Sequence, residues 1–341
     1  MKNNNVYGVI ELSDLTIRLV KTEEFDDLMK LMNTAFSFEK SEEKFEHILP
    51  KLYFKENKEM IHYGAFLDGL LVASVGLYFM TFKSKFGLLK VGCVGAVSTH
   101  PDYRKNGYFT LIMKKILSYA KRHNFDMLLL TGNRFRYNHF GFENAGRKMV
   151  VGVSKRTSKL LKSEMFEVSR LDKNNLSDIS DCLNLYNKQL QHILRTKDNF
   201  YNHVVSWNCV PYIVKVVGKT IGYFSIKDDN QVCEFVCNNK YLDTMMTAAL
   251  GDRNEVYIEL PYSLYSNKLL SKVDMYEVHS SAMFNVLNWE NVQKYLGFDQ
   301  LKTFEFYKMS KKERFRHLLG CDEFSSDFCK LDMFVYNCDL G

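Results

Sequence analysis

Basic residues and a glycine meet in a loop between a strand-like run and a helical pattern. The run covers residues 91–98, and the helical pattern begins at about Tyr108. The loop between them holds Arg104, Lys105, Asn106 and Gly107. A helix start leaves backbone N–H groups unpaired and carries the positive end of the helix dipole, and a glycine there lets a phosphate approach the main chain. The loop therefore predicts a site for a diphosphate, to which Arg104 and Lys105 add positive charge.

Two further elements must hold this loop in place. In residues 108–122, apolar side chains recur at spacings of three and four while basic side chains take the opposite face, which indicates an amphipathic helix packed on a sheet. The apolar residues of that helix are Phe109, Ile112, Met113, Ile116, Leu117 and Ala120. The apolar run 127–130 is typical of a buried strand in a βαβ unit. The predicted phosphate site therefore lies between parallel strands.

Two motifs in this region resemble the GNAT superfamily of acyl-CoA-dependent N-acyltransferases. Residues 104–109, RKNGYF, are similar to the signature Arg/Gln-x-x-Gly-x-Gly/Ala that precedes the family's helix. Residues 137–142, YNHFGF, are similar to the Tyr-x-x-x-Gly-Phe element that closes the family's domain. Phe109 departs from the first pattern, because the family has Gly or Ala there. We expect its side chain to point into the interface between helix and sheet, since otherwise it would crowd the pyrophosphate.

The resemblance implies acetyl-CoA as a co-substrate and an amine as the acetyl acceptor. The cofactor contacts that it implies are Ala96, Val97, Ser98, Arg104, Lys105, Asn106, Gly107, Tyr108 and Phe109. As in the family, a backbone N–H near residues 96–98 would stabilise the oxyanion. Tyr137 stands at the position of the family's general acid, and a phenol with a pKa near ~10 keeps its proton at pH 7. The alternative for Tyr137 is an aromatic residue of the core.

The chain before the loop predicts the rest of an α/β domain. Residues 16–20 alternate as a strand, Thr22 is placed to cap the following helix, and residues 41–49 form a second helical stretch. Asp68 and Gly69 separate two strand-like runs and predict a hairpin. This order of elements resembles that of the GNAT family, and the resemblance implies an α/β (α+β) architecture, the GNAT fold, with a mixed sheet flanked by helices.

The order of elements recurs after residue 165 and predicts a second domain of the same fold. The loop before its second-half helix, residues 238–241, has no arginine and glycine and cannot cradle a diphosphate. We predict a catalytic GNAT domain at 1–150, a linker at 151–164, a degenerate GNAT-like domain at 165–285 and a short C-terminal region at 286–341. The tandem resembles bacterial acetyltransferases of the "enhanced intracellular survival" type, with a shortened C-terminal region. In that region, residues 311–319 predict a helix and residues 331–336 a strand.

The sequence does not identify the general base, and several candidates stay open. His100 and His139 lie close to the motifs, but histidines beside loops are commonly surface or capping residues. An acidic cluster consists of Glu39, Glu42, Glu43 and Glu46. It either borders the acceptor cleft and attracts a cationic amine, or forms the solvated face of a helix. In relatives of the tandem type the chain terminus can supply a carboxylate to the active site, which makes Gly341 a further candidate.

Composition argues against several other classes of function. The net charge of +6 comes from 46 basic and 40 acidic residues that are scattered along the chain, so nucleic-acid binding is not expected. The 8 cysteines lack C-x-x-C spacing, which predicts free thiols and no metal site. Residues 1–6 are polar, and the longest apolar run, 69–82, is too short to cross a membrane. We therefore predict a cytoplasmic protein without a membrane partner.

Together these patterns predict an acetyl-CoA-dependent N-acetyltransferase in which a primary amine attacks the thioester directly. The acceptor is a small-molecule or peptide amine, and aminoglycosides, polyamines, protein lysines and amino sugars all stay open. A homo-oligomer also stays open. The alternative from another class is a non-catalytic acyl-CoA-binding or scaffolding protein, motivated by Phe109 in the loop and by the missing base.

Overall fold

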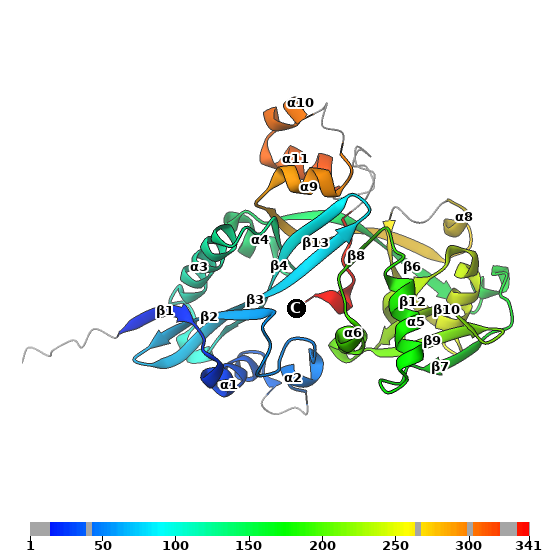
Figure 1. Cartoon of the computed structure of the whole chain (residues 1–341), viewed down its shortest axis with the longest axis horizontal. Helices are drawn as coiled ribbons and strands as arrows, with labels where there is room; N and C mark the ends of the chain where they lie inside the picture. Colours follow the sequence, from blue (N-terminus) through cyan, green and yellow to red (C-terminus); the bar gives the residue numbers. More distant parts are fainter. Residues whose placement is uncertain (1–13, 39–42, 263–266, 299–302, 321–332, 341) are drawn as a thin grey trace, which may run out of the picture.

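A computed structural model describes residues 14–38, 43–262, 267–298, 303–320 and 333–340. Figure 1 shows two halves side by side, with residues 333–340 between them. The strands at residues 15–130 belong to the first half, and those at residues 167–261 belong to the second half. The strands are β1 (Leu15–Leu19), β2 (Met60–Leu67), β3 (Leu70–Ser84), β4 (Gly87–Thr99), β5 (Met127–Leu130), β6 (Glu143–Ser154), β7 (Glu167–Arg170), β8 (Gln191–Ile193), β9 (Val210–Val216), β10 (Lys219–Lys227), β11 (Gln231–Cys237), β12 (Glu255–Pro261) and β13 (Met275–Val286). The α-helices are α1 (Phe25–Ala35), α2 (Phe45–Ile48), α3 (Tyr108–Arg122), α4 (Arg134–Tyr137), α5 (Leu176–Tyr186), α6 (Lys197–Val204), α7 (Leu242–Leu250), α8 (Asn267–Leu270), α9 (Trp289–Tyr295), α10 (Thr303–Lys308) and α11 (Lys311–Leu319).

Within the described residues the strands form one mixed sheet of 13 strands, which confirms the predicted fold class. Its order is β1-β2-β3-β4-β5-β13-β6-β12-β11-β10-β9-β7, and β8 pairs with β3. The first half follows sequence order from β1 to β5, and β7, β9, β10, β11 and β12 repeat that order from the other edge. In both halves the series ends in a parallel pair, β4 with β5 and β11 with β12, joined by α3 or α7. The fold is therefore duplicated.

The two halves exchange strands at the centre of the sheet. β13 follows the second half in sequence but lies between β5 and β6 and pairs antiparallel with both. β6 follows the first half and pairs with β12 along residues 148–154. Each half therefore completes its sheet with a strand that follows the other half in the sequence. The predicted boundaries at 150 and 285 fall inside β6 and β13, two strands that join the halves.

The two faces of the first-half sheet carry different helices. On one face α3 packs through Ile112, Met113 and Ile116, which are fully buried, and its bounds agree with the predicted amphipathic helix. On the other face α1 and α2 pack through apolar side chains that include Leu28 and Phe45. A short 3-10 helix (Pro101–Tyr103) and a loop connect β4 to α3, and this packing places the first turn of α3 at the carboxyl end of β4.

One local turn prediction is confirmed and one cap prediction is wrong. Asp68 and Gly69 have φ values of +49° and +82° and connect β2 to β3 as the predicted hairpin. Thr22 does not cap the following helix, because it begins a short 3-10 helix itself. The carboxylate of Glu24 instead accepts a hydrogen bond from the backbone N–H of Lys21 at 2.8 Å.

Three further predicted elements have different outcomes: one is shorter than expected, one is confirmed and one is absent. Of residues 41–49, only α2 is helical, and residues 41–42 lie outside the described part of the chain. The helix predicted at 311–319 is confirmed as α11. The strand predicted at 331–336 is wrong for residues 333–336, which are not part of any strand, and residues 331–332 lie outside the described part.

Residues 333–340, which we call the tail segment, explain the wrong strand prediction. Met333 and Val335 belong to the core on the α1 face of the first half, whereas Phe334 and Tyr336 pack with α5 and α6 of the second half. An extended chain turns successive side chains to opposite sides whether or not a strand lies beside it. The alternation is therefore real, but it serves two hydrophobic cores and no β-ladder.

Three further properties concern the described residues as a set. No described helix combines the length and the apolarity needed to span a bilayer. Free thiols are found at Cys93, Cys182, Cys209, Cys233, Cys237 and Cys338. Cys321 and Cys329 lie outside the described ranges. Within those ranges, no group of three or more His, Cys, Asp or Glu side chains is arranged to hold a metal ion.

Candidate active site

The loop between β4 and α3 presents unpaired backbone donors. Lys105 and Gly107 have left-handed φ values of +69° and +77°. No described residue accepts a hydrogen bond from the backbone N–H groups of residues 105–109. Successive N–H groups in such conformations form a concave anion site, and the helix that begins at Tyr108 adds the positive end of its dipole. This geometry fits the predicted diphosphate.

The loop forms one wall of a cavity of about 580 Å³, which we call the cofactor cavity. The cavity is lined by Ala35, Phe36, Val97, Thr99, Tyr103, Arg104, Lys105, Asn106, Gly107, Tyr108, Phe109, Thr110 and Arg136. The lining thus includes every predicted cofactor contact except Ala96 and Ser98. It carries three cations and, among the described residues, no carboxylate. Arg104 also donates to the carbonyl oxygen of Ala35 at 3.3 Å, which ties the loop to the end of α1.

The strands β4 and β5 separate beside this cavity. They pair over residues 91–93 and 127–129 and then diverge. A β-bulge interrupts the pairing of β4 with β3 at Ala96, whose φ is +46°. Ala96 is buried, Val97 lines the cofactor cavity, and the hydroxyl of Ser98 donates to the carbonyl oxygen of Ala96 at 3.1 Å. The residues predicted to stabilise an oxyanion therefore lie on an irregular strand edge beside the opening.

Tyr137 lies just after β5, close to the same opening. Asn133 caps α4 by accepting a hydrogen bond from the backbone N–H of Phe135 at 2.9 Å, and α4 ends at Tyr137. The tyrosine ring packs on Gly132, where a Cβ would lie 2.8 Å from its Cε2 atom. Burial raises the pKa of the Tyr137 hydroxyl, and the nearby Arg136 opposes this shift. The phenol therefore keeps its proton at neutral pH, as a general acid must.

Phe109 is half-buried: it packs against the core between α3 and the sheet, as expected, and it also lines the cofactor cavity. Its ring meets the rings of Tyr137 and Phe140 edge-on, with centroids 5.8 and 5.5 Å apart. Phe109 therefore links the first turn of α3 to the tyrosine. Arg136, another cavity residue, was not predicted, because its place beside the loop depends on how α4 packs. Its only signal in the sequence is that it precedes Tyr137.

Neither histidine near the motifs is placed as a general base. The Nδ1 atom of His100 accepts a hydrogen bond from the backbone N–H of Asp102 at 3.4 Å, which is a local capping contact. His139 is exposed, and its ring lies 4.0 Å from that of Phe140, measured between centroids. These positions agree with the surface and capping roles considered for them.

The acidic residues lie partly outside the described chain. Glu39, Glu42 and Gly341 fall in residues that the structure does not describe. Glu43 is exposed and accepts a hydrogen bond from the side-chain amide of Asn208, in the second half, at 3.1 Å. Glu46 is half-buried on α2, and its Oε2 atom is buried without a hydrogen-bond partner. The described glutamates therefore lie beside the junction of the two halves.

A second cavity, of about 300 Å³, lies where the two halves and the tail segment meet, and we call it the central cavity. It is lined by Thr131, Trp207, Lys227, Gln231, Cys233, Asn337 and Leu340. Thr131 follows β5 directly, so one wall of the central cavity lies at the carboxyl end of the strand that diverges from β4. Among the described residues its walls carry one cation, Lys227, and no carboxylate.

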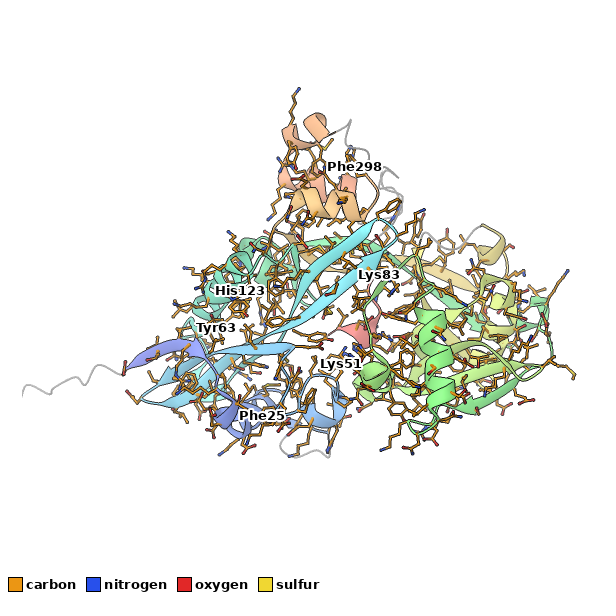
Figure 2. All side chains as sticks on the ribbon, viewed as in Figure 1. Phe25, Lys51, Tyr63, Lys83, His123 and Phe298 are labelled. Carbon is orange, nitrogen blue, oxygen red and sulfur yellow. The ribbon has the colours of Figure 1, made fainter. Side chains whose placement is uncertain are left out.

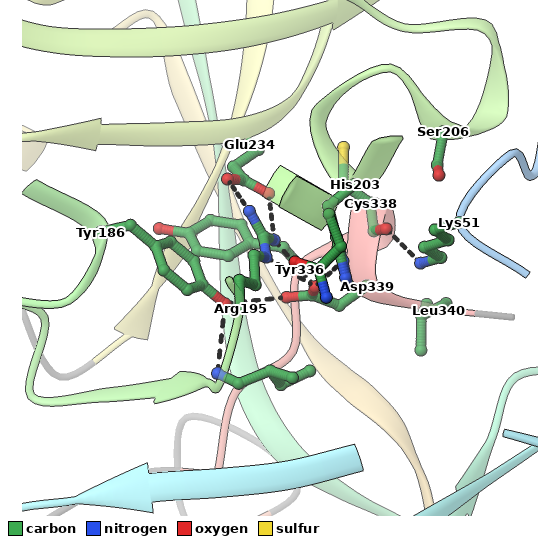
Figure 3. A network of polar contacts seen from close by, with 12 residues as sticks. Lys51, Tyr186, Arg195, His203, Ser206, Glu234, Tyr336, Cys338, Asp339 and Leu340 are labelled. Atoms are coloured by element: carbon green, nitrogen blue, oxygen red, sulfur yellow. Dashed lines mark hydrogen bonds and ion pairs between the residues drawn. The ribbon is translucent and has the colours of Figure 1, made fainter. Parts of the chain in front are cut away.

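Buried charges hold the tail segment against the second half (Figure 3). Arg195 donates to both carboxylate oxygens of Glu234 at 2.7 Å and to Asp339 at 2.8 and 3.2 Å. The Nδ1 atom of His203 lies 3.0 Å from Asp339. Burial and the charge of Arg195 lower the pKa of His203 to about 3, so the neutral ring donates its Nδ1–H. Although burial acts against it, Arg195 holds the pKa of Asp339 well below its usual range.

Two more donors hold the backbone of the tail segment. Lys51, which Figure 2 labels between the halves, donates to the carbonyl oxygen of Cys338. Burial lowers the pKa of Lys51 to about 8. The indole N–H of Trp207 donates to the carbonyl oxygen of Leu340 at 3.2 Å. Sequence patterns did not reveal any of these contacts, because they join residues that are far apart along the chain.

Comparisons with known proteins agree with this geometry. Residues 16–145 match the family model described as an acetyltransferase (GNAT) domain. No curated protein matches the sequence. A probable N-acyltransferase of unknown function from Enterococcus faecalis V583 has a TM-score of 0.67 and 15% identity, over 83% of this chain and 74% of that chain.

Two further solved structures have a similar fold. A GCN5-related N-acetyltransferase from Kribbella flavida has a TM-score of 0.62 and 14% identity, over 82% of this chain and 73% of that chain. Eis1 from Mycobacterium abscessus has a TM-score of 0.59 and 13% identity, over 83% of this chain and 76% of that chain. At these identities the likeness concerns the fold, and it confirms the predicted GNAT fold.

Proposed function

We propose that this chain, with its acetyltransferase-type domain at residues 16–145, is an acetyl-CoA-dependent N-acetyltransferase that acts on a primary amine. The observation that carries the proposal is that three features meet at one opening in the sheet. They are the unpaired donors of residues 105–109, the bulge at Ala96 and the buried Tyr137. An anion site, a candidate oxyanion site and a proton donor are the groups that acyl transfer from a thioester requires.

The proposed reaction is a direct attack of the amine on the thioester carbonyl. The amine nitrogen forms the new C–N bond and the C–S bond breaks, so that coenzyme A leaves as a thiolate. The nitrogen loses one proton to solvent as the amide forms, Tyr137 gives its proton to the sulfur, and solvent returns a proton to Tyr137. The bulge at Ala96 supplies backbone N–H groups to the carbonyl oxygen as it gains negative charge.

The amine must lose a proton to react. A free alkylamine has a pKa near ~10.4, so neutralising it at pH 7 requires about 5 kcal/mol unless the site helps. We retain the carboxylate of Gly341 as the proposed base, and this part of the proposal rests on the resemblance to the tandem type alone. A C-terminal amide, or an added residue, is then expected to lower turnover without changing acetyl-CoA affinity. Unchanged turnover would remove Gly341 from the mechanism.

In this proposal the first half is catalytic and the second half is not. The second-half loop before α7 uses its own donors: Asn238 accepts hydrogen bonds from the backbone N–H groups of Lys240 at 3.2 Å and Tyr241 at 2.9 Å. It therefore offers fewer free donors than residues 105–109 do, and no arginine. The duplicated strand order and the fold shared with Eis1 support a place among tandem-GNAT acetyltransferases of the "enhanced intracellular survival" type.

The decisive experiment measures release of free thiol from acetyl-CoA in the presence of a panel of amines. The panel contains a polyamine, an aminoglycoside, an amino sugar and a lysine peptide. Thiol release that depends on one of these amines, with the acetylated product found by mass spectrometry, is the expected result. Binding of acetyl-CoA without transfer to any amine would favour the non-catalytic acyl-CoA-binding alternative, for which the Phe109 ring in the cavity wall is the motivating observation.

A further inference from the structure

The second half has an opening between strands that corresponds to the opening beside the cofactor cavity. β11 and β12 pair in parallel only at residues 231–232 and 257–258 and then diverge, as β4 and β5 do. In both halves one helix connects the two diverging strands. The second half therefore retains the opening of the fold although its loop before α7 lacks the donors for a diphosphate.

The tail segment occupies this second opening. The Tyr336 hydroxyl lies 3.0 Å from the carbonyl oxygen of Phe235 in β11, beyond the residues that β11 pairs with β12. The next tail residue, Asn337, donates its side-chain amide to Glu259 in β12 at 2.8 Å. The tail segment thus bridges the two strands at the place where they no longer pair with each other.

The Arg195 cluster sets the register of the tail segment in the opening. An alternating apolar segment that slid by two residues would keep the same faces toward the same cores, so apolar packing alone specifies its position weakly. The buried carboxylate of Asp339 removes that freedom, because a buried charge is stable only where its partners satisfy it. Arg195 and His203 supply those partners at 2.8 and 3.0 Å. Lys51 and Trp207 then fix the carbonyl groups on either side of Asp339.

Register in the tail segment determines the shape of the central cavity. Asn337 and Leu340, which flank the anchored Asp339, both line that cavity. A shift of the segment by two residues would exchange these walls for other side chains. The cofactor cavity has no lining residue from the tail segment, so its shape does not depend on the anchor.

We infer that Arg195 and Asp339 are positioning residues for the acceptor: by docking the tail segment into the opening between β11 and β12, they set the wall of the central cavity that receives the amine. The second half then serves as the receptor for the chain's own C-terminal segment. This inference rests on the proposed function, since it assigns the amine to the central cavity.

The test compares two substitutions in the same cluster. Asp339→Asn removes the anchor of the tail segment and leaves Arg195 paired with Glu234. Glu234→Gln removes the same charge from the same arginine and leaves the Arg195–Asp339 pair in place. Each variant therefore loses one buried negative charge and keeps one buried ion pair to Arg195. Tyr223 stays beside residue 234, and His203 and Tyr186 stay beside residue 339. Each is studied by amine kinetics, by acetyl-CoA binding and by the emission of Trp207, which bonds to Leu340.

Because the chain has 2 tryptophans, a Trp289→Phe background isolates the Trp207 emission. We expect Asp339→Asn to shift that emission and to raise KM for the amine at least tenfold above Glu234→Gln, with equal acetyl-CoA affinity in both. Equal amine KM in the two variants would overturn the positioning role while leaving the acetyltransferase assignment intact. A wild-type protein that binds acetyl-CoA but acetylates no amine would overturn the proposed function, and this inference with it.

Discussion

Gly107 offers a direct test of the cofactor cavity, because a matched glycine exists elsewhere in the chain. Gly107 has φ of +77°, and no heavy atom lies within 4 Å of the position that a Cβ would take. Gly218, in the hairpin between β9 and β10, has φ of +71° and equally open surroundings. Glutamate at either position suffers similar backbone strain. Only Gly107→Glu places a carboxylate in the cavity, beside Arg104 and Lys105.

The expected thermal shifts follow from general magnitudes. A non-glycine residue in the left-handed region costs roughly 1 to 2 kcal/mol. Unfolding entropy of about 2.1 cal/mol/K per residue gives about 0.7 kcal/mol/K for 341 residues, so the strain lowers Tm by about 2 °C in both variants. Ligand at about 100 times its Kd stabilises the fold by about 2.7 kcal/mol, which raises Tm by about 4 °C.

The assay is thermal unfolding with and without saturating acetyl-CoA. We expect a rise of about 4 °C in the wild type and in Gly218→Glu, and a rise below about 1 °C in Gly107→Glu, by the same arithmetic. The two variants thus lose similar stability but differ in their response to the ligand. If Gly107→Glu keeps the full rise, the unpaired donors of residues 105–109 do not bind the cofactor, and the reasoning from loop geometry fails.

Three further outcomes are expected. Tyr137→Phe should lower turnover by about 10² to 10⁴, as for loss of a general acid, and keep the acetyl-CoA thermal shift; unchanged turnover would end its assigned role. His203 has a pKa of about 3 in the folded protein and stays neutral there, whereas the histidine of the unfolded chain binds a proton below about pH 6.5. The free energy of unfolding should therefore fall on acidification by up to about 1.4 kcal/mol per pH unit. His203→Asn should reduce this pH dependence between about pH 6.5 and 5, measured by urea unfolding. Gly146→Ala should destabilise the fold by about 1 to 3 kcal/mol more than Gly69→Ala, measured by thermal unfolding. A Cβ at Gly146 would lie 2.2 Å from the carbonyl oxygen of Met333, whereas a Cβ at Gly69 would meet open space. Equal losses of stability would show that the tail segment moves away to make room for the added methyl group.

Features with a local cause could be predicted from the sequence. The helix at 108–122, the Asp68–Gly69 turn and the helix at 311–319 were each predicted from residues inside the element, and the structure confirms them. The loop with Gly107 belongs to the same class, because a positive φ and a helix start act over a few residues. The repeat of the strand order was visible for the same reason, since each copy shows its own local pattern.

Other predictions failed or were missing because the cause was not local. Thr22 was a plausible cap by type, but the Glu24 carboxylate takes the backbone donor of Lys21. The tail segment has the alternation of a strand, yet its neighbours are two hydrophobic cores. Arg136 joins the cofactor cavity through the packing of α4. Each of these outcomes depends on which of several adequate partners comes close in space.

The kind of fold, the glycine-containing loop before α3 and a tyrosine after the next strand could all be recognised in the sequence, because side-chain type and spacing act over a few residues. The place of β13 between β5 and β6, and that of the tail segment between the two halves, became visible only in the folded chain. The same holds for Arg195, which joins Glu234 and Asp339. Such contacts connect residues far apart in the chain, and their energy comes from burial and charge pairing that exist only once both halves have folded.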